Sequence, residues 1–182
     1  MKIAFYGSSL LSSYWNGAAT YYRGIIRALA ARGYDVTFYE PDVWDRQRNR
    51  DIDPPEWARV VVYEGTVPAL QAVAREAADA DIVVKASGVG FEDDLILDSV
   101  MAAARPGALR VFWDVDAPAT LAEIRAAPDH PMRRMLTRLD LVLTYGGGDP
   151  VVRAYREIGA RACVPIYNAL DPETHHPVPP ET

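Results

Sequence analysis

Two aspartates stand at the end of an apolar segment, in a position where a carboxylate could do chemistry. Asp114 and Asp116 close or follow the segment 109–114, which has the composition of a buried strand. A carboxylate at the end of such a strand can accept the proton of a hydroxyl group, which is the general-base role in an inverting group transfer. Asp116 is equally well placed to cap a helix that begins near Pro118, so a structural role remains an alternative.

A run of glycines could bind a ligand through its backbone. Tyr145 is followed by Gly146, Gly147 and Gly148. Consecutive glycines let a backbone approach a ligand closely, and a helix that starts there would direct free N–H groups toward it. The alternative is a tight turn that only joins a strand to a helix.

Asn16 and Gly17 stand just before the first helical segment. The N-terminus of a helix favours phosphate groups through its unpaired N–H groups and its dipole, so these residues could lie under the phosphates of a donor. Gly7 is too far from Gly17 for a dinucleotide fingerprint, in which Gly-x-Gly-x-x-Gly directly follows the first strand.

Charged residues inside or beside apolar segments complete the list of candidates. Lys85 lies in an otherwise apolar strand, where a buried ammonium must be paired. An ion pair with a carboxylate on a neighbouring strand, such as Asp114, is favoured over a ligand contact. Arg46, Arg48 and Arg50 alternate with acidic and polar residues, which indicates a solvated loop.

Composition narrows the classes of function. The net charge of −6 disfavours binding to a nucleic-acid backbone, which needs clustered Lys and Arg. No apolar run approaches the roughly 18–20 residues of a membrane-spanning helix. The single cysteine, Cys163, excludes an intrachain disulfide and makes a reducing cytoplasm the expected compartment. The three histidines have no ligand spacing, and no structural metal is expected.

The elements that would position these residues alternate between strand-like and helical patterns. This alternation predicts an α/β three-layer sandwich with a mainly parallel sheet of about seven strands. Continuously apolar runs such as 60–62 and 82–84 indicate strands that are covered on both faces. The predicted strands are 2–6, 35–40, 59–64, 81–86, 109–114, 141–145 and 163–167.

Helix signals and a change of composition set the boundaries. Gly33 is placed to end the first helix, and the pairs Thr66 with Pro68 and Asp149 with Pro150 resemble helix starts. Residues 1–167 form one predicted domain. Residues 168–182 contain four prolines and are predicted to form a linker.

Several segments resemble glycosyltransferases built from two Rossmann-like domains, the GT-B architecture. Residues 16–20, followed by 27–36, are similar to the opening of those enzymes, with Tyr34 in place of the usual histidine. Residues 112–118, 144–149 and 168–173 resemble the CgeB-like branch of the group.

The resemblance implies that this chain is the N-terminal, acceptor-side half of a sugar-nucleotide-dependent glycosyltransferase, with no covalently bound cofactor. Its Rossmann-like partner, a C-terminal domain, would hold most of the donor. The acidic donor-binding motif of that domain has no counterpart before Thr182, so this piece alone is expected to transfer no sugar. Asp114 and Asp116 would be catalytic, and the donor or substrate would contact Asn16, Gly17, Lys85, Tyr145, Gly146, Gly147 and Gly148.

Two other functions are compatible with such a fold. Glu40 ends the second predicted strand, where an acid could bind a ribose hydroxyl in a nucleotide-dependent oxidoreductase. The glycine spacing speaks against that function. A stand-alone binding or regulatory module without catalytic activity is the second alternative, since a fold does not establish an activity.

Overall fold

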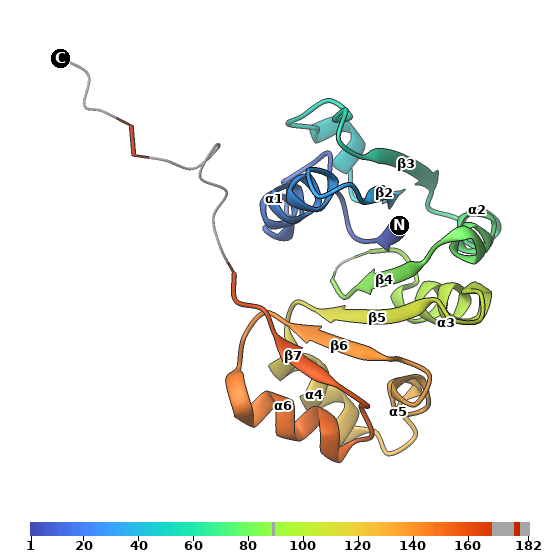
Figure 1. Cartoon of the computed structure of the whole chain (residues 1–182), viewed down its shortest axis with the longest axis vertical. Helices are drawn as coiled ribbons and strands as arrows, with labels where there is room; N and C mark the ends of the chain where they lie inside the picture. The colour runs from blue at the N-terminus through green and yellow to red at the C-terminus, as the bar shows by residue number, and fades with distance from the viewer. Residues whose placement is uncertain (89, 169–176, 179–182) are drawn as a thin grey trace.

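The chain folds as a three-layer α/β sandwich around a parallel sheet (Figure 1). The computed structural model describes residues 1–88, 90–168 and 177–178. Seven strands lie in the order β3-β2-β1-β4-β5-β6-β7, and each neighbouring pair is parallel. The predicted Rossmann-like fold is therefore confirmed. The strands are β1 (Lys2–Tyr6), β2 (Asp35–Asp42), β3 (Arg59–Glu64), β4 (Ile82–Ala86), β5 (Leu109–Asp114), β6 (Leu141–Thr144) and β7 (Cys163–Pro165).

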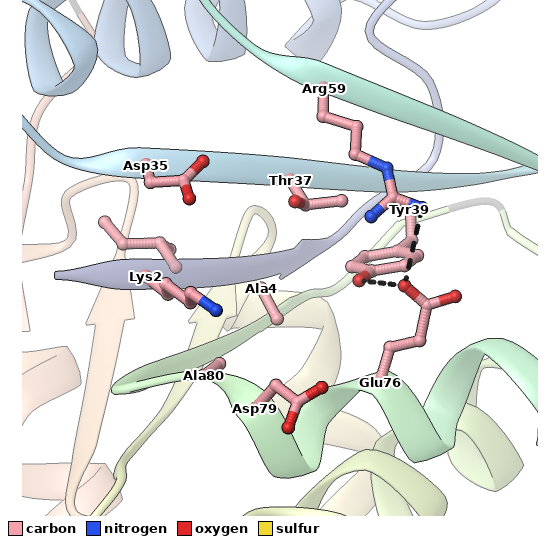
Figure 2. A pocket seen from close by; sticks show the side chains of 10 residues that line it. Lys2, Ala4, Asp35, Thr37, Tyr39, Arg59, Glu76, Asp79 and Ala80 are labelled. Atoms are coloured by element: carbon pink, nitrogen blue, oxygen red, sulfur yellow. Dashed lines mark hydrogen bonds and ion pairs between the residues drawn. The ribbon is translucent and has the colours of Figure 1, made fainter.

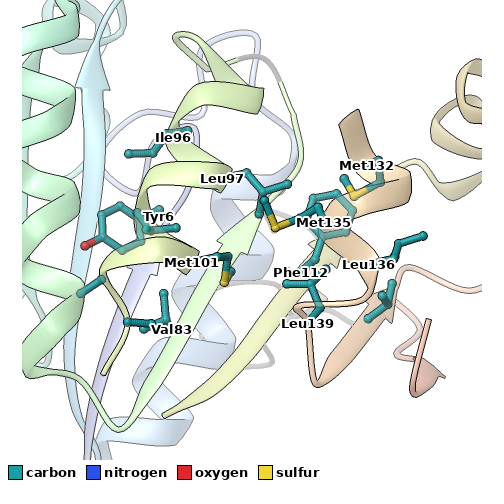
Figure 3. Packing of buried hydrophobic residues seen from close by; sticks show 14 of the residues in the cluster. Tyr6, Val83, Ile96, Leu97, Met101, Phe112, Met132, Met135, Leu136 and Leu139 are labelled. Carbon is teal, nitrogen blue, oxygen red and sulfur yellow. The ribbon is translucent and has the colours of Figure 1, made fainter. Parts of the chain in front are cut away.

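Helices cover both faces of the sheet. One face packs on α1, where Tyr22 and Ile26 contact a cluster that includes Phe5 and Phe38. The other face packs on the remaining α-helices, and Figure 3 shows side chains of α3 and α5 in one cluster with residues of β4 and β5. The helices are α1 (Ala18–Ala30), η1 (Arg46–Asn49), α2 (Val67–Ala74), η2 (Arg75–Asp79), α3 (Asp93–Ala103), α4 (Ala117–Ala126), α5 (Pro131–Leu136) and α6 (Gly148–Glu157).

The strand boundaries differ from the prediction mainly at the sheet edges. The last strand was predicted over 163–167 but ends at Pro165, and β2 continues to Asp42. The run 60–62 is not buried on both faces, because β3 is an edge strand and Val62 is 36% exposed. An apolar run alone does not distinguish an edge strand from a central one.

Local signals placed one helix start correctly and another incorrectly. The Thr66 side chain caps α2 by accepting a hydrogen bond from the Ala69 N–H, as predicted. Asp149 does not cap α6, because that helix already begins at Gly148 and its N-cap is Gly147. The glycine takes that position because the turn before α6 needs a left-handed backbone.

The strand order reverses between β1 and β4, and in open α/β sheets such a reversal marks a ligand-binding edge. Strands β2 and β3 extend the sheet in one direction from β1, whereas β4 to β7 extend it in the other. Open α/β sheets bind ligands beyond the carboxyl ends of their strands, at such a switch point. No helix in the described part of the chain is long and apolar enough to span a membrane.

Candidate functional site

Asp114 is buried at the carboxyl end of β5 and holds several elements together. Its side chain is fully inaccessible. One carboxylate oxygen accepts hydrogen bonds from Ser87 Oγ at 3.0 Å, Thr120 Oγ1 at 3.0 Å and the Asp116 N–H at 3.1 Å. The other oxygen accepts from the Tyr155 hydroxyl of α6. Asp114 thus connects the ends of β4 and β5 to α4 and α6.

These contacts define what Asp114 can do. Burial and the Asp114 charge raise the pKa of Tyr155, so this phenol stays protonated and keeps donating its hydrogen bond. A carboxylate with no exposed surface and four donors cannot reach an acceptor hydroxyl in this conformation. Its direct role is to position the loop that carries Asp116.

Asp116 is exposed two residues further along, where the chain leaves the sheet. Its side chain caps α4 by accepting a hydrogen bond from the Ala119 N–H at 3.5 Å. The predicted cap is therefore present. The bond is long, and the carboxylate remains open to solvent, so a cap and a chemical role are compatible at this position.

The glycines at the start of α6 form a turn with a left-handed backbone. Gly146, Gly147 and Gly148 all have positive φ, at 123°, 79° and 53°. A Cβ on Gly147 would lie 2.2 Å from the Val151 side chain, so the turn and the packing both require glycine there. Tyr167 lies against Gly146 on the outside of the turn. The first turn of α6 has no side-chain cap.

Tyr145 packs inside the domain. Its ring lies 4.9 Å from that of Tyr21 and 6.2 Å from that of Trp113, both edge-on. Burial raises the pKa of its hydroxyl. Tyr145 therefore anchors the start of the glycine turn in the domain. It also connects this turn to α1, since Tyr21 lies on that helix.

Asn16 and Gly17 have different environments. Asn16 is buried, donates to the Ser9 and Ser12 carbonyls and accepts from Ser8 Oγ at 2.8 Å. It organises the loop between β1 and α1. Gly17 is exposed at the N-cap of α1, with no atom within 4 Å of where its Cβ would be. The start of α1 is therefore open to solvent at Gly17, where free N–H groups could meet an anion.

Lys85 is paired, but its partner is not the predicted one. Its ammonium bonds Asp93 at the start of α3 and donates to the Ala86 carbonyl at 2.5 Å. The suggested ion pair with Asp114 is absent because Asp114 is occupied by its own donors and Asp93 comes closer. A small hollow at the switch point is lined by Tyr6, Gly7, Pro41, Tyr63, Lys85, Gly90, Phe91, Asp93 and Ile96.

The Glu40 side chain makes all its hydrogen bonds to neighbouring loops. Its buried carboxylate accepts from Ser9 Oγ, from the Leu10 and Leu11 N–H groups and from Gln47 Nε2. It has no accessible oxygen for a ribose hydroxyl.

Arg46 corrects the solvated-loop interpretation of the arginines. It is 1% exposed and donates to the Ser8 carbonyl at 3.4 Å. Burial lowers its pKa, and the nearby Glu40 charge opposes that shift. Arg48 and Arg50 are exposed, as predicted. Alternation with polar residues cannot reveal that one arginine turns inward to meet a buried carboxylate.

The proposed site residues therefore fall into two groups along one edge. Asp116, Gly17 and the glycine turn are at the carboxyl edge, and the Tyr145 N–H donates to the Asp114 carbonyl at 3.2 Å. Asp114, Asn16, Tyr145 and Lys85 are buried or partly buried and support that edge from within. Whether the first group binds one ligand stays a prediction.

A second polar pocket opens at the opposite, amino edge (Figure 2). The Tyr39 hydroxyl donates to Glu76 at 2.9 Å, and Glu76 also pairs with Arg59 at 3.8 Å. The pocket is lined by Lys2, Ile3, Ala4, Asp35, Thr37, Tyr39, Arg59, Glu76, Asp79 and Ala80. Because its cations are matched by acids and it lies away from the switch point, the carboxyl edge remains the candidate site. Among the described residues, no group of His, Cys, Asp and Glu could hold a metal ion.

Solved structures share this fold at low sequence identity. No family model and no curated protein matches the sequence. An α-glucosyltransferase in complex with UDP and a 13-mer DNA containing an HMU base matches with a TM-score of 0.61 at 12% identity, over 94% of this chain and 43% of that one. The chain shares its fold with part of that enzyme. A complex of an α-glucosyltransferase with UDP and DNA containing an A:G mismatch matches with a TM-score of 0.56 at 14% identity, over 96% and 41%.

The chain spans less than half the length of these enzymes. A short-chain dehydrogenase/reductase from Serratia marcescens also matches, with a TM-score of 0.47 at 12% identity over 92% of this chain and 96% of that one. That likeness is too loose to bear on function. At these identities the comparisons establish the fold, and the activity is a separate question.

Proposed function

We propose that this chain is the acceptor-side domain of a sugar-nucleotide-dependent glycosyltransferase of the GT-B type, in the CgeB-like branch. Residues 1–167 form the domain and 168–182 the linker to a second, C-terminal Rossmann-like domain. The observation that carries the proposal is the match to the α-glucosyltransferase, which covers 94% of this chain and 43% of that one, as one domain of two would. Most of the predicted linker lies outside the described residues.

The carboxyl edge would supply the acceptor side of the reaction. In this proposal Asp116 accepts the proton of the acceptor hydroxyl, because it is the exposed carboxylate at the end of β5. Asp114 positions Asp116 through the hydrogen bond to its N–H. Gly17 and the first turn of α6 offer N–H groups to the donor phosphates, which helix N-termini favour. The second domain would bind the rest of the donor.

Two features of the chain separate the proposal from its alternatives. Glu40 would have to bind a ribose in an oxidoreductase, and all its contacts are already made within the β1–α1 and β2–β3 loops. The solved neighbours hold DNA, but the net charge of −6 on this chain opposes a nucleic-acid acceptor. We therefore propose an acceptor other than DNA.

The test uses a longer chain that includes the second domain, with a panel of sugar nucleotides. Release of the nucleotide diphosphate in the presence of acceptor measures transfer. Asp116→Asn is expected to lower kcat by about 10²–10⁴-fold if the carboxylate is the base. Asp129→Asn is the matched control, because Asp129 is an exposed aspartate in the turn after α4 and so lies toward the other edge of the sheet.

Each outcome separates the candidate functions. Turnover that depends on Asp116 and not on Asp129 supports the proposal. A chain that binds ligands without turning over any sugar nucleotide would be a binding module, and a chain that oxidises a nicotinamide cofactor would be an oxidoreductase.

A further inference from the structure

Trp44 is an exposed indole held in a strained backbone conformation at the carboxyl edge. It is 62% exposed and lies two residues beyond the end of β2. Trp44 and Asp45 have φ of 59° and 55°, in the left-handed region that residues with a side chain rarely adopt. Such strain persists where the surrounding structure enforces it, and it concentrates at binding sites.

The indole is fixed in place from the other side of the switch point. Trp44 Nε1 donates to the Gly90 carbonyl at 3.2 Å. Gly90 follows β4, so the side chain reaches from the end of β2 past the end of β1 to the loop before α3. An exposed tryptophan anchored through its polar atom presents a rigid apolar face to solvent.

A hollow beside this indole is lined by polar side chains. The lining residues are Asp42, Val43, Trp44, Asp45, Gln47 and Arg48. Gln47 is held on both sides, since its Nε2 donates to Glu40 at 2.6 Å and its Oε1 accepts from Arg50 Nε at 2.8 Å. Within the described part of the chain, the Asp45 side chain forms only a long, exposed ion pair with Arg48, at 3.5 Å.

Asp42 has an exposed carboxylate at the last position of β2. Among the residues that the structure describes, its side chain has no hydrogen bond or ion pair. The hollow therefore combines a flat apolar wall with two carboxylates that can accept hydrogen bonds from a ligand.

We propose that this hollow, the Trp44 subsite, binds a neutral sugar ring of a carbohydrate acceptor. This inference rests on the proposed function, which it deepens by naming the acceptor class. The C–H groups on one face of a pyranose carry partial positive charge and stack on the negative face of an indole. Its hydroxyl groups donate to Asp42 and Asp45, because ionised carboxylates are strong acceptors.

The same carboxylates keep the donor out of the subsite. Two negative charges against the single cation of Arg48 repel a diphosphate, so the sugar nucleotide has to bind elsewhere on the edge. The exposed Asp116 follows β5, on the other side of the switch point. An acceptor with one sugar ring at Trp44 and its reacting hydroxyl at Asp116 would thus extend across the place where the strand order reverses.

The test follows the indole N–H signals of the tryptophans by NMR, with this chain of 182 residues. The probes are maltotriose, cellotriose and tri-N-acetylchitotriose, titrated separately, with tetramethylammonium as a cationic probe. We expect at least one trisaccharide to shift the Trp44 signal in a saturable way. The signal of Trp15, which is 85% exposed and follows β1, should stay in place and serves as the internal control.

Variants give the matched comparison. Trp44→Ala and the double variant Asp42→Asn with Asp45→Asn should each abolish binding, whereas Trp15→Ala should leave it unchanged. Equal effects of Trp44→Ala and Trp15→Ala would overturn the subsite, as would an absence of saturable binding by every trisaccharide. Binding of tetramethylammonium alone would identify a cation site and would overturn the assignment to carbohydrate.

Kinetics of the longer chain separate this inference from the proposed function. Trp44→Ala should raise the KM for a carbohydrate acceptor by about 2- to 12-fold, which corresponds to the roughly 0.5–1.5 kcal/mol of one aromatic stacking contact. If Trp44→Ala leaves transfer unchanged, the proposed function would stand and the Trp44 subsite would be contradicted. If trisaccharides bind but the longer chain transfers no sugar, the Trp44 subsite would be supported and the proposed glycosyltransferase activity would be contradicted.

Discussion

At the scale of single residues, the two neighbouring aspartates differ because one faces inward and the other faces solvent. Asp114 gathers donors from β4, α4 and α6, and the side chain of Asp116 is exposed. The positions of the two aspartates in the sequence do not distinguish their roles. Asp114 therefore has a structural role, and only the exposed carboxylate of Asp116 could take the role proposed above.

This difference makes a direct prediction about stability. Asp114→Asn should lower the free energy of unfolding by about 2–3 kcal/mol, because an amide leaves donors of a buried charged acceptor unpaired. Asp116→Asn should cost about 1 kcal/mol or less, the scale of losing part of one cap. Urea unfolding of both variants measures the contrast. Equal losses would mean that Asp114 is less engaged than its contacts indicate.

A second residue-scale prediction concerns acid. The hydrogen bonds from Arg23 and Ser13 hold the pKa of Asp51 well below its ordinary value. A depressed folded-state pKa stabilises the fold fully above the unfolded value of about 4, and this contribution is lost as the pH falls through the folded-state pKa. The exposed pair with Arg23 limits the gain to about 1 kcal/mol or less.

The measurement compares the wild type with Asp51→Asn in urea from pH 7 to pH 2. The wild type should be the more stable protein at neutral pH, and the difference should shrink below pH 4. Asp53→Asn, which removes an exposed carboxylate two residues away, is the control for the loss of a surface charge. A difference that persists unchanged at pH 2 would contradict the assignment.

At the scale of elements, the turn between β6 and α6 depends on both backbone and packing. Gly107→Ala meets open space at φ 83° and should cost only the left-handed penalty of about 1–2 kcal/mol. Gly147→Ala has nearly the same φ and in addition meets Val151, which should add about 1–3 kcal/mol of overpacking. Urea unfolding of both variants tests this, and equal losses would show that Val151 moves aside.

The edge strand β7 offers a chemical probe of local opening. Burial raises the pKa of Cys163 to about 11, so the folded chain carries little of the reactive thiolate at neutral pH. Alkylation by iodoacetamide should be far slower in the native state than in urea. If β7 opens only with the whole domain, the rate should rise with urea in parallel with global unfolding. A fast rate without urea would identify β7 as a locally unstable element.

At the scale of the whole molecule, folding and activity should separate. The described sheet and helices bury two clusters on its two faces, so this chain of 182 residues should melt cooperatively. If the proposed function is right, this chain should transfer no sugar alone, because without the proposed second domain it would lack positioning worth up to about 7–11 kcal/mol. Thermal melting and turnover of sugar nucleotides are to be compared with the longer chain. Equal turnover by both would place the whole active site here.

The sequence by itself determined the order of the elements and the parallel sheet. Strand and helix signals are local, since they depend on the periodicity of apolar residues and on caps such as Thr66. The same signals placed Asp116 and the glycine run at strand ends, because each follows its strand directly along the chain. They also predicted the cap that Asp116 makes on α4.

Only the tertiary structure decided which polar residues face inward. Lys85 pairs with Asp93 eight residues further along, Arg46 lies by Glu40, and β3 is an edge strand. Each of these outcomes depends on how loops and strands come together in space. The Trp44 subsite was missed for the same reason. The anchor of its indole at Gly90 is 46 residues away, and the exposed face of a tryptophan leaves no periodic signal. The partners and the exposure of these side chains depend on which strands and loops become neighbours. Local sequence patterns do not contain that information.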